Sequence, residues 1–223
     1  MTEAAPAWRN ENVSDVVAAV TIAEGTESHS YPAEHTPSLL TGSLTNLADA
    51  VHYMCLLHGR HPGVIDHAAV RTADNAARSW LIRAADGFAA ERAYLTQLVV
   101  AVGPLPSTAG QDSSETAVTQ QRHALDMLAQ SDRRGCALGA AVALVLDWSA
   151  VRRILDIAAL RVGIEPRRSL LPDVSSTRAV LEALAGDDPA VARAAQFGAI
   201  QMLRQHRGLW DLLQARAFVR ARG

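Results

Sequence analysis

The segment from Asp132 to Gly163 carries two neighbouring apolar stripes at helical spacing, and no other pattern in the chain constrains the fold as strongly. The first stripe is Ala141, Leu144, Trp148, Val151, Leu155, Ala158 and Val162, and the second is Ala140, Ala143, Asp147, Ala150, Ile154 and Ile157. A helix that is apolar on two faces must be covered on both, so we expect it at the centre of a helical bundle. Asp147 lies within the second stripe, and we therefore expect its carboxylate to be buried.

Turn and cap signals divide the rest of the chain into further helical segments. The predicted helices are 13–23, 43–58, one that begins after Thr72 or Asp74 and runs to 102, 112–131, 132–162, 176–185 and 189–222, the last with a possible break at Gly208. Asp112 with Glu115 resembles a capping box, and Asp132 is suited to cap the helix after it. The sequence thus predicts an all-α, single-domain helical bundle over 43–223 with a four-helix centre and a helical C-terminal addition. An N-terminal extension or lid over 1–42 precedes it.

Composition and charge exclude several classes of protein. The formal net charge of −2 gives no overall attraction to nucleic acid or to an anionic membrane. All 21 basic residues are arginine, which excludes lysine Schiff-base chemistry and the P-loop lysine. The two cysteines make no disulfide framework, the polar N-terminus is unlike a signal peptide, and the apolar run 136–146 is too short to span a bilayer. We expect a cytoplasmic protein that acts on a small molecule, without nucleic-acid or membrane partners; a homodimer stays open.

Residues 52–67, HYMCLLHGRHPGVIDH, hold four of the eight histidines. Only His58 continues the apolar seam of its helix, which is Leu44, Leu47, Val51 and Met54. His61 and His67 flank the HPG turn at the predicted mouth of the bundle, where loop residues often carry function. The stretch therefore predicts one inward histidine, His58, and not a cluster.

Polar groups interrupt the apolar faces of the other central helices as well. Glu91 lies in the middle of the seam Leu81, Ala84, Phe88, Leu95, Leu98 and Val102, and Tyr94 follows it by about one turn. The helix 112–131 offers Gln121 on its apolar face, with Arg122 and His123 on the flanks. Such groups have two interpretations: a structural network that fixes helix register, or a site inside the bundle. A carboxylate desolvated there would have a raised pKa and could exchange a proton with a nearby histidine.

Under the functional interpretation, His58 and Glu91 act as acid and base, and Asp147 orients the histidine. Arg122 or His123 would hold an anionic or oxygen-rich substrate, with Tyr94, Gln121 and His61 as further substrate-binding candidates. Since no nucleotide motif is present, a lyase, isomerase or hydrolase fits better than redox chemistry. The rival hypothesis is a non-catalytic interaction or regulatory protein with a structural polar core, whose basic C-terminal helix binds a partner.

A third hypothesis is a mononuclear metal enzyme. Its ligands would be His58, Glu91, His123 and Asp147, a set of imidazoles and carboxylates of the kind that non-haem iron uses. The Glu-x-x-His signature of di-iron bundles is absent, and the nearest match is Asp49-Ala-Val-His52. We therefore predict no cofactor, with a single divalent metal as the alternative.

Two further patterns allow alternative interpretations. Gly135, Gly139 and Ala143 form a flat ridge, which predicts close helix packing or, alternatively, room for a flat ligand. The segment 24–42 combines two prolines with acidic residues and histidines, so it is expected to be a linker or a lid over the site.

The segments HGRHPGVID, FAAERAYL and SDRRGCALGAAVALVLDW together resemble an uncharacterised family of all-helical bacterial proteins. The likeness covers roughly residues 50 to 163. It implies a helical fold and a bacterial cytosolic context, and it implies no activity.

Overall fold

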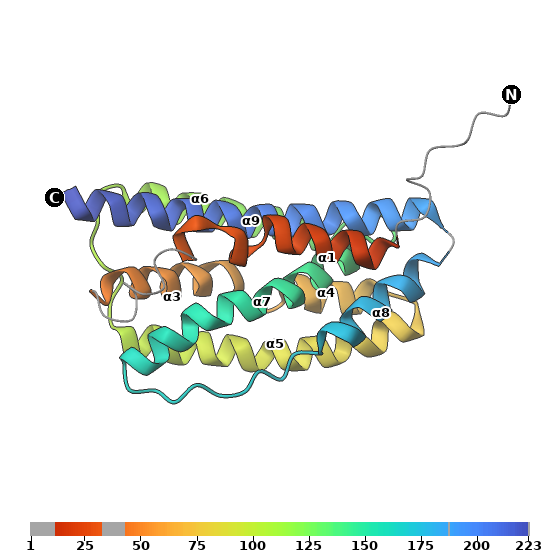
Figure 1. The fold of residues 1–223 in the computed structure, drawn as a ribbon, viewed down its shortest axis with the longest axis horizontal. Helices are drawn as coiled ribbons and strands as arrows, with labels where there is room; N and C mark the ends of the chain where they lie inside the picture. Colours follow the sequence, from red (N-terminus) through yellow and green to blue (C-terminus); the bar gives the residue numbers. More distant parts are fainter. Residues whose placement is uncertain (1–11, 33–42, 187, 223) are drawn as a thin grey trace, which may run out of the picture.

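The computed structural model describes residues 12–32, 43–186 and 188–222, and all regular secondary structure in these ranges is helical (Figure 1). The helices are α1 (Val13–Glu24), the 3-10 helix η2 (Thr26–Ser28), α3 (Thr45–His58), α4 (Val64–Arg71), α5 (Asn75–Val102), α6 (Gln111–Ala129), α7 (Cys136–Arg161), α8 (Val174–Ala185) and α9 (Pro189–Arg222). Within these ranges there is no strand. The prediction of an all-α, single-domain bundle is confirmed.

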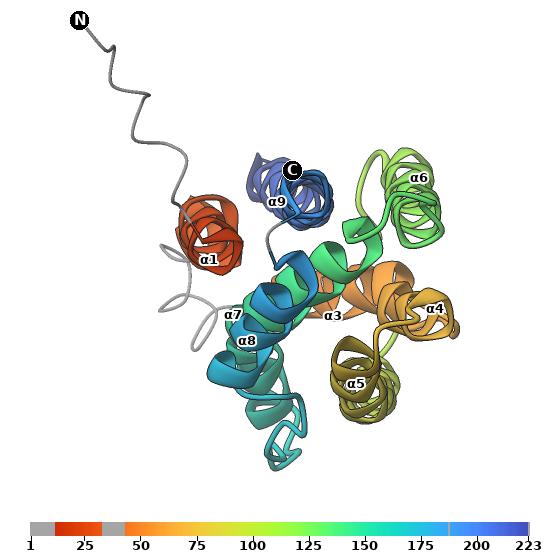
Figure 2. The same ribbon diagram turned by 90° about the vertical axis from the view of Figure 1, so that its right-hand side faces the viewer.

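Helix α7 is the centre of the bundle, as its two apolar stripes predict. In Figure 2 the other helices are arranged around it, and it contacts every other α-helix. Both stripes are buried except for their last members, Val162 and Ile157. Each large aliphatic side chain fully buried in this way, such as Leu144, contributes about 1.5–3 kcal/mol to folding.

The glycine ridge of α7 serves close packing against α9. A Cβ on Gly139 would overlap the backbone carbonyl of Ala195, and one on Gly198 would overlap the carbonyl of Cys136. The backbone of α9 therefore occupies the space that a flat ligand would need. Helix α9 runs without a break through Gly208 and lies along α7, so the predicted C-terminal addition forms part of the core.

The basic C-terminal part of α9 is held by the bundle itself. Arg216 donates from Nε and Nη2 to the two oxygens of the buried Asp49 on α3, at 2.8 and 3.1 Å. Arg220 donates to Asp49 at 2.6 Å and to Asn46 at 2.6 Å. The bulky apolar residues of this part, Trp210 among them, are buried, apart from the half-buried Leu212 and the exposed Phe218 and Val219.

Most helix boundaries match the predicted ones, and the differences have local causes. Helix α6 begins after Gly110, so Asp112 lies inside the helix and the predicted capping box is wrong. Helix α7 begins after Gly135, and Asp132 pairs instead with Arg71 on α4. Helix α4 was not predicted at all. It is only eight residues long, and it is stabilised by Asp66, which accepts from the backbone N–H of Gly63 and from Arg92 on α5.

The described N-terminal residues belong to the bundle. Helix α1 packs on α9, α8 and α7, with Val17 fully buried, so the boundary predicted at residue 43 does not separate it from the domain. Of the predicted lid, residues 24–32 are described, and Glu34 and His35 lie outside the described residues. None of the described helices is both long and apolar enough to cross a membrane.

Candidate functional site

A chain of buried hydrogen bonds joins Asp147 to His58 through a second histidine, His206 on α9. His206 Nδ1 lies 2.6 Å from Oδ2 of Asp147, and its Nε2 lies 2.7 Å from Nε2 of His58. Asp147, His206 and His58 are exposed by only 2, 0 and 6 %. We call these three residues the relay. They come from the middle of α7, the middle of α9 and the last residue of α3.

The segment between α1 and residue 29 fixes the carboxylate end of the relay. The backbone N–H of Thr26 donates to Oδ1 of Asp147 at 2.7 Å, and its hydroxyl donates to Oδ2 at 2.6 Å. The same hydroxyl accepts from the indole N–H of Trp210 at 2.9 Å. Gly25 allows this close approach, because a Cβ there would lie 2.5 Å from Oδ1 of Asp147.

These donors decide the charge of Asp147. Burial alone would raise its pKa, but the hydrogen bond and charge of His206, together with the two Thr26 donors, outweigh burial and lower the pKa below its ordinary value. Asp147 is therefore a carboxylate at neutral pH. It can only accept, so His206 must carry a proton on Nδ1.

The tautomer of His58 follows from that of His206. Burial, followed by the nearby charges of His206 and Arg92, lowers the pKa of His58 well below its ordinary value, so His58 is neutral at pH 7. A charge on His206 opposes one on His58, so the pair carries at most one positive charge. In the tautomer in which His206 is protonated on Nδ1 alone, its Nε2 accepts and His58 donates from its own Nε2. Nδ1 of His58 then carries a lone pair, and it has no hydrogen-bond partner among the described residues.

Two aromatic rings hold His58 in place. The His58 ring makes T-shaped contacts with the rings of Trp148 and Phe88. The ring centroids are 5.6 and 6.1 Å away, and the interplanar angles are 90° and 80°. Phe88 and Trp148 also contact each other at 4.8 Å. The His58 ring lies nearly perpendicular to that of His206, at 86°.

His58 borders a small cavity of about 20 Å³, which we call the His58 cavity. Its other lining residues are Leu57, Arg60, Pro62, Gly63, Val64, Phe88, Arg122, Leu125, Asp126 and Leu144. This volume suits about one water molecule. The relay therefore ends at a residue that borders a space for one water or a small reacting group.

Glu91 lies in a different network and does not contact His58. Nη1 of Arg152 donates to both oxygens of Glu91, at 2.9 and 2.8 Å, and the hydroxyl of Ser169 donates to Oε1 at 2.7 Å. Arg152 also binds Asp156 at 2.7 Å, and the hydroxyl of Tyr94 donates to Asp156 at 2.9 Å. These contacts connect α5 and α7 to the loop before α8, which is the structural interpretation of a buried carboxylate.

The other predicted residues are spread over the surface near α6 and α4. Arg122 lines the His58 cavity, whereas His123 is exposed. Gln121 donates to the backbone carbonyl of Gln205 at 3.4 Å, and His61 is exposed, 3.7 Å from Asp66. The structure thus brings together His58, Asp147 and Arg122 from the predicted set, and leaves Glu91, Tyr94, Gln121, His123 and His61 apart from them.

The four predicted metal ligands are not assembled. His58 and Asp147 are separated by His206, while Glu91 pairs with Arg152 and His123 is exposed. Over the described ranges, no three His, Cys, Asp or Glu side chains are grouped so that they could hold a metal ion.

Two residues of the site were missed from sequence. His206 continues an apolar stripe of α9, Ala199, Met202, Leu209 and Leu213, and this signal could have identified it. Thr26 has no comparable signal, because it lies in a short 3-10 helix with no periodic pattern.

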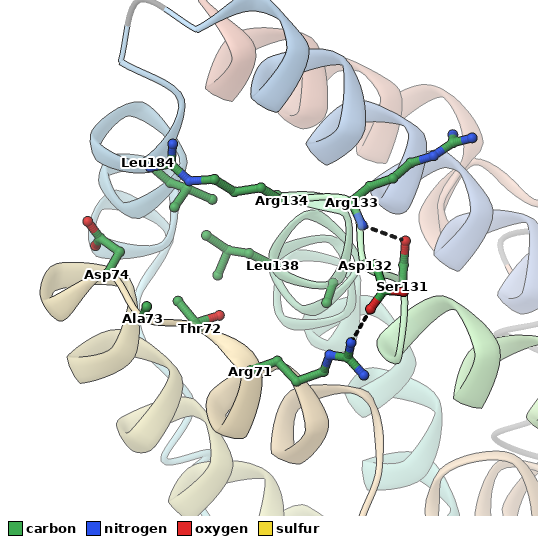
Figure 3. Close-up of a pocket in the computed structure, with 12 residues that line it drawn as sticks. Arg71, Thr72, Ala73, Asp74, Ser131, Asp132, Arg133, Arg134, Leu138 and Leu184 are labelled. Carbon is green, nitrogen blue, oxygen red and sulfur yellow. Dashed lines mark hydrogen bonds and ion pairs between the residues drawn. The ribbon is translucent and has the colours of Figure 1, made fainter.

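A larger hollow lies at the end of the bundle where α7 begins, with a volume of about 520 Å³ (Figure 3). Leu138 and Leu184 point into it, while Arg71 at its edge bonds to Asp132 and Arg133 extends away from it. Arg133 lies over the ring of Phe197 instead, 5.8 Å from its centroid. No relay residue lines this hollow, so it is separate from the candidate site.

Comparison with known proteins places the chain among relatives of unknown function. No curated protein and no solved structure matches it. Residues 21–221, which include every residue of the relay, match one protein family. The chain therefore belongs to DUF6975, a family of unknown function.

Proposed function

We propose that this protein is a cytoplasmic small-molecule enzyme of the lyase, isomerase or hydrolase type, in which His58 is the base. One observation carries the proposal: a buried chain of hydrogen bonds runs from the Asp147 carboxylate through His206 to His58, and His58 borders the His58 cavity. Chains of this kind, in which a carboxylate orients a histidine, are a recurring means of proton transfer in catalysis.

The relay moves a proton in two coupled steps. Nδ1 of His58 takes a proton from the substrate or from a water, and the proton on Nε2 of His58 passes to Nε2 of His206. His206 becomes an imidazolium whose Nδ1–H faces the Asp147 carboxylate at 2.6 Å. The positive charge thus rests beside a carboxylate and not on His58, where burial disfavours it. Return of the proton reverses both transfers.

Glu91 has no part in this proposal, because its contacts with Arg152 and Ser169 explain its burial. Arg122 keeps its proposed role beside the site, since it lines the His58 cavity. No step needs a cofactor.

The test is a turnover screen with a panel of esters, phosphate esters and hydroxy acids, followed through proton release by a pH indicator. His58→Asn and His206→Asn should each remove the activity of the wild type. His67→Asn on α4 is the matched control and should keep it, because His67 does not line the cavity or join the relay. Equal turnover in His58→Asn and wild type would refute the proposal.

A second measurement needs no substrate. Long-range proton–nitrogen correlation spectra at pH 7 should report His58 protonated on Nε2 only and His206 protonated on Nδ1 only. A His58 that carries its proton on Nδ1 would contradict the assignment of the base.

The rival is a non-catalytic helical interaction or regulatory protein with a structural polar core. One observation favours it: three other buried or half-buried carboxylates, on Glu91, Asp49 and Asp66, are each paired with an arginine. Such pairs fix helix register without chemistry. The relay differs from them, because its carboxylate contacts histidine and threonine and its far end is free. The two hypotheses separate on the His58→Asn result.

A further inference from the structure

A groove between α3 and α6 adjoins the His58 cavity. Its volume is about 380 Å³, and we call it the α3–α6 groove. It is lined by His52, Tyr53, Cys55, Leu56, Arg60, Val99, Leu105, Glu115 and Arg122. Arg60 and Arg122 line both the groove and the cavity, so the two hollows share one boundary.

These two arginines have free hydrogen-bond donors. Neither forms an ion pair with any residue that the structure describes, in contrast to Arg92, Arg152 and Arg216. An unpaired guanidinium presents several N–H donors in a planar fork that matches carboxylate and phosphate oxygens. Two of them at one boundary form a site for an oxyanion.

Two acidic residues lie near these arginines, Glu115 in the lining of the groove and Asp126 in that of the His58 cavity. Oε1 of Glu115 already accepts from Nε2 of Gln111 at 2.9 Å. Asp126 borders the His58 cavity but not the groove, and it makes no ion pair with Arg122. The groove is lined by two arginines and one carboxylate, so its formal charge stays positive.

The rest of the groove is mostly apolar, formed by Leu56, Val99 and Leu105. At about 380 Å³ it lies within the size range of small-molecule sites, whereas the adjoining cavity admits only about one water. A ligand must therefore stay in the groove, with its charged end at the boundary.

We propose that the α3–α6 groove binds a small amphipathic oxyanion, an apolar chain or ring that carries one carboxylate or phosphate group. The charged group binds Arg60 and Arg122, and the apolar part lies on Leu56, Val99 and Leu105. This rests on the proposed function in taking the bound anion as the substrate of His58. The reacting bond then lies next to the charged group, where the boundary meets the His58 cavity.

The test is calorimetric titration of the full chain with octanoate and with octyl phosphate. Octanol lacks the charge, and acetate and inorganic phosphate lack the chain, so all three should bind much more weakly. Arg60→Gln and Arg122→Gln should each weaken binding of the octyl anions by about tenfold, because a hydrogen bond to a charged group contributes about that factor. The matched control is Arg204→Gln, an exposed arginine of α9 outside both hollows, which should bind as the wild type does.

Three results would overturn the site: octanol binding as tightly as octanoate, unchanged binding in both arginine variants, or unchanged binding in Leu105→Gln. Circular dichroism of each variant shows that it is folded. The affinities for octanoate and octyl phosphate show which oxyanion the groove prefers. Preference for either one supports the site.

His58→Asn separates this inference from the proposed function. That variant should bind octanoate like the wild type and lose turnover. If binding depends on Arg60 and Arg122 while turnover does not depend on His58, the groove stands and the catalytic proposal fails. If turnover depends on His58 while binding does not depend on the two arginines, the groove proposal is wrong and the proposed function stands.

Discussion

Replacing Thr26 with valine tests how much the relay depends on the segment that follows α1. Valine has nearly the shape of threonine, so the change removes a hydroxyl and creates little empty space. Two hydrogen bonds are lost: the 2.6 Å bond to Oδ2 of Asp147 and the 2.9 Å bond from the indole of Trp210. The backbone bond from residue 26 to Oδ1 remains.

The magnitude follows from the two losses. A hydrogen bond to a buried charge contributes about 1.5–3 kcal/mol, and an unpaired buried donor, here the Trp210 indole N–H, costs about 1–3 kcal/mol. Thr26→Val should therefore lower the free energy of unfolding by about 3 kcal/mol. For a chain of this size that corresponds to a fall in Tm of about 6–12 °C.

Urea titration followed by circular dichroism measures this change. The matched control is Thr96→Val on the exposed face of α5, where the hydroxyl bonds only to the carbonyl of Arg92 one turn earlier. The control should change stability by less than about 0.5 kcal/mol. If Thr26→Val is no less stable than Thr96→Val, the hydroxyl does not stabilise the relay and the assignment of donors to Asp147 is wrong.

The pH dependence of the same variant gives a second check. The pKa of Asp147 is lower in the folded state than its ordinary value of 3.8, so its stabilisation is present above that pH and is lost as the pH falls through the folded-state pKa. Thr26→Val removes part of this stabilisation. The difference between wild type and variant should therefore narrow once the pH falls below about 3.8.

Three further predictions concern other parts of the bundle. Gly198→Ala should destabilise the protein by several kcal/mol, because the new Cβ overlaps the carbonyl of Cys136. The new Cβ of Gly208→Ala meets only the flexible end of Gln121, so this control should be neutral or stabilising. Calorimetric Tm values of the two variants test the difference. Glu91→Gln should lower the free energy of unfolding by about 3 kcal/mol in urea titration, because it removes the negative charge that compensates the buried Arg152. The same variant should leave any His58-dependent turnover intact. Because the folded-state pKa of His58 is lowered, the unfolded chain binds more protons below about pH 6.5. Wild-type stability should thus fall as the pH drops from about 6.5 to 5, and His58→Asn should fall less over the same range.

Periodicity in the sequence predicted the central position of α7 and the burial of Asp147 and His58. These predictions succeeded because an apolar stripe reports which face of a helix is covered, and the position of a polar residue within it reports burial. Helix α4 escaped prediction because eight residues after a Pro-Gly turn hold too little pattern, and its stability comes from Asp66 and Arg92, which are distant in sequence.

The partners of the buried groups were harder to predict than their burial. Glu91 and His58 both lie on inward seams, but a seam does not say at which height along the bundle two helices meet. The structure places Arg152 opposite Glu91 and His206 opposite His58. His206 lies between Arg204 and Arg207, and the charge of this stretch obscures the apolar stripe that His206 continues.

The burial of Asp147 has a consequence for how the chain folds. Its partners come from positions 26 and 206, on either side of it in sequence and far from it. During synthesis α7 is complete well before His206 is made, so Asp147 has no histidine partner until the middle of α9 has been synthesised. A charge left unpaired in a protein interior is costly, and α7 cannot be fully enclosed until α9 docks. We therefore expect the bundle to close in one cooperative step in which α9 and the segment around Thr26 meet on α7, and not helix by helix as the chain emerges.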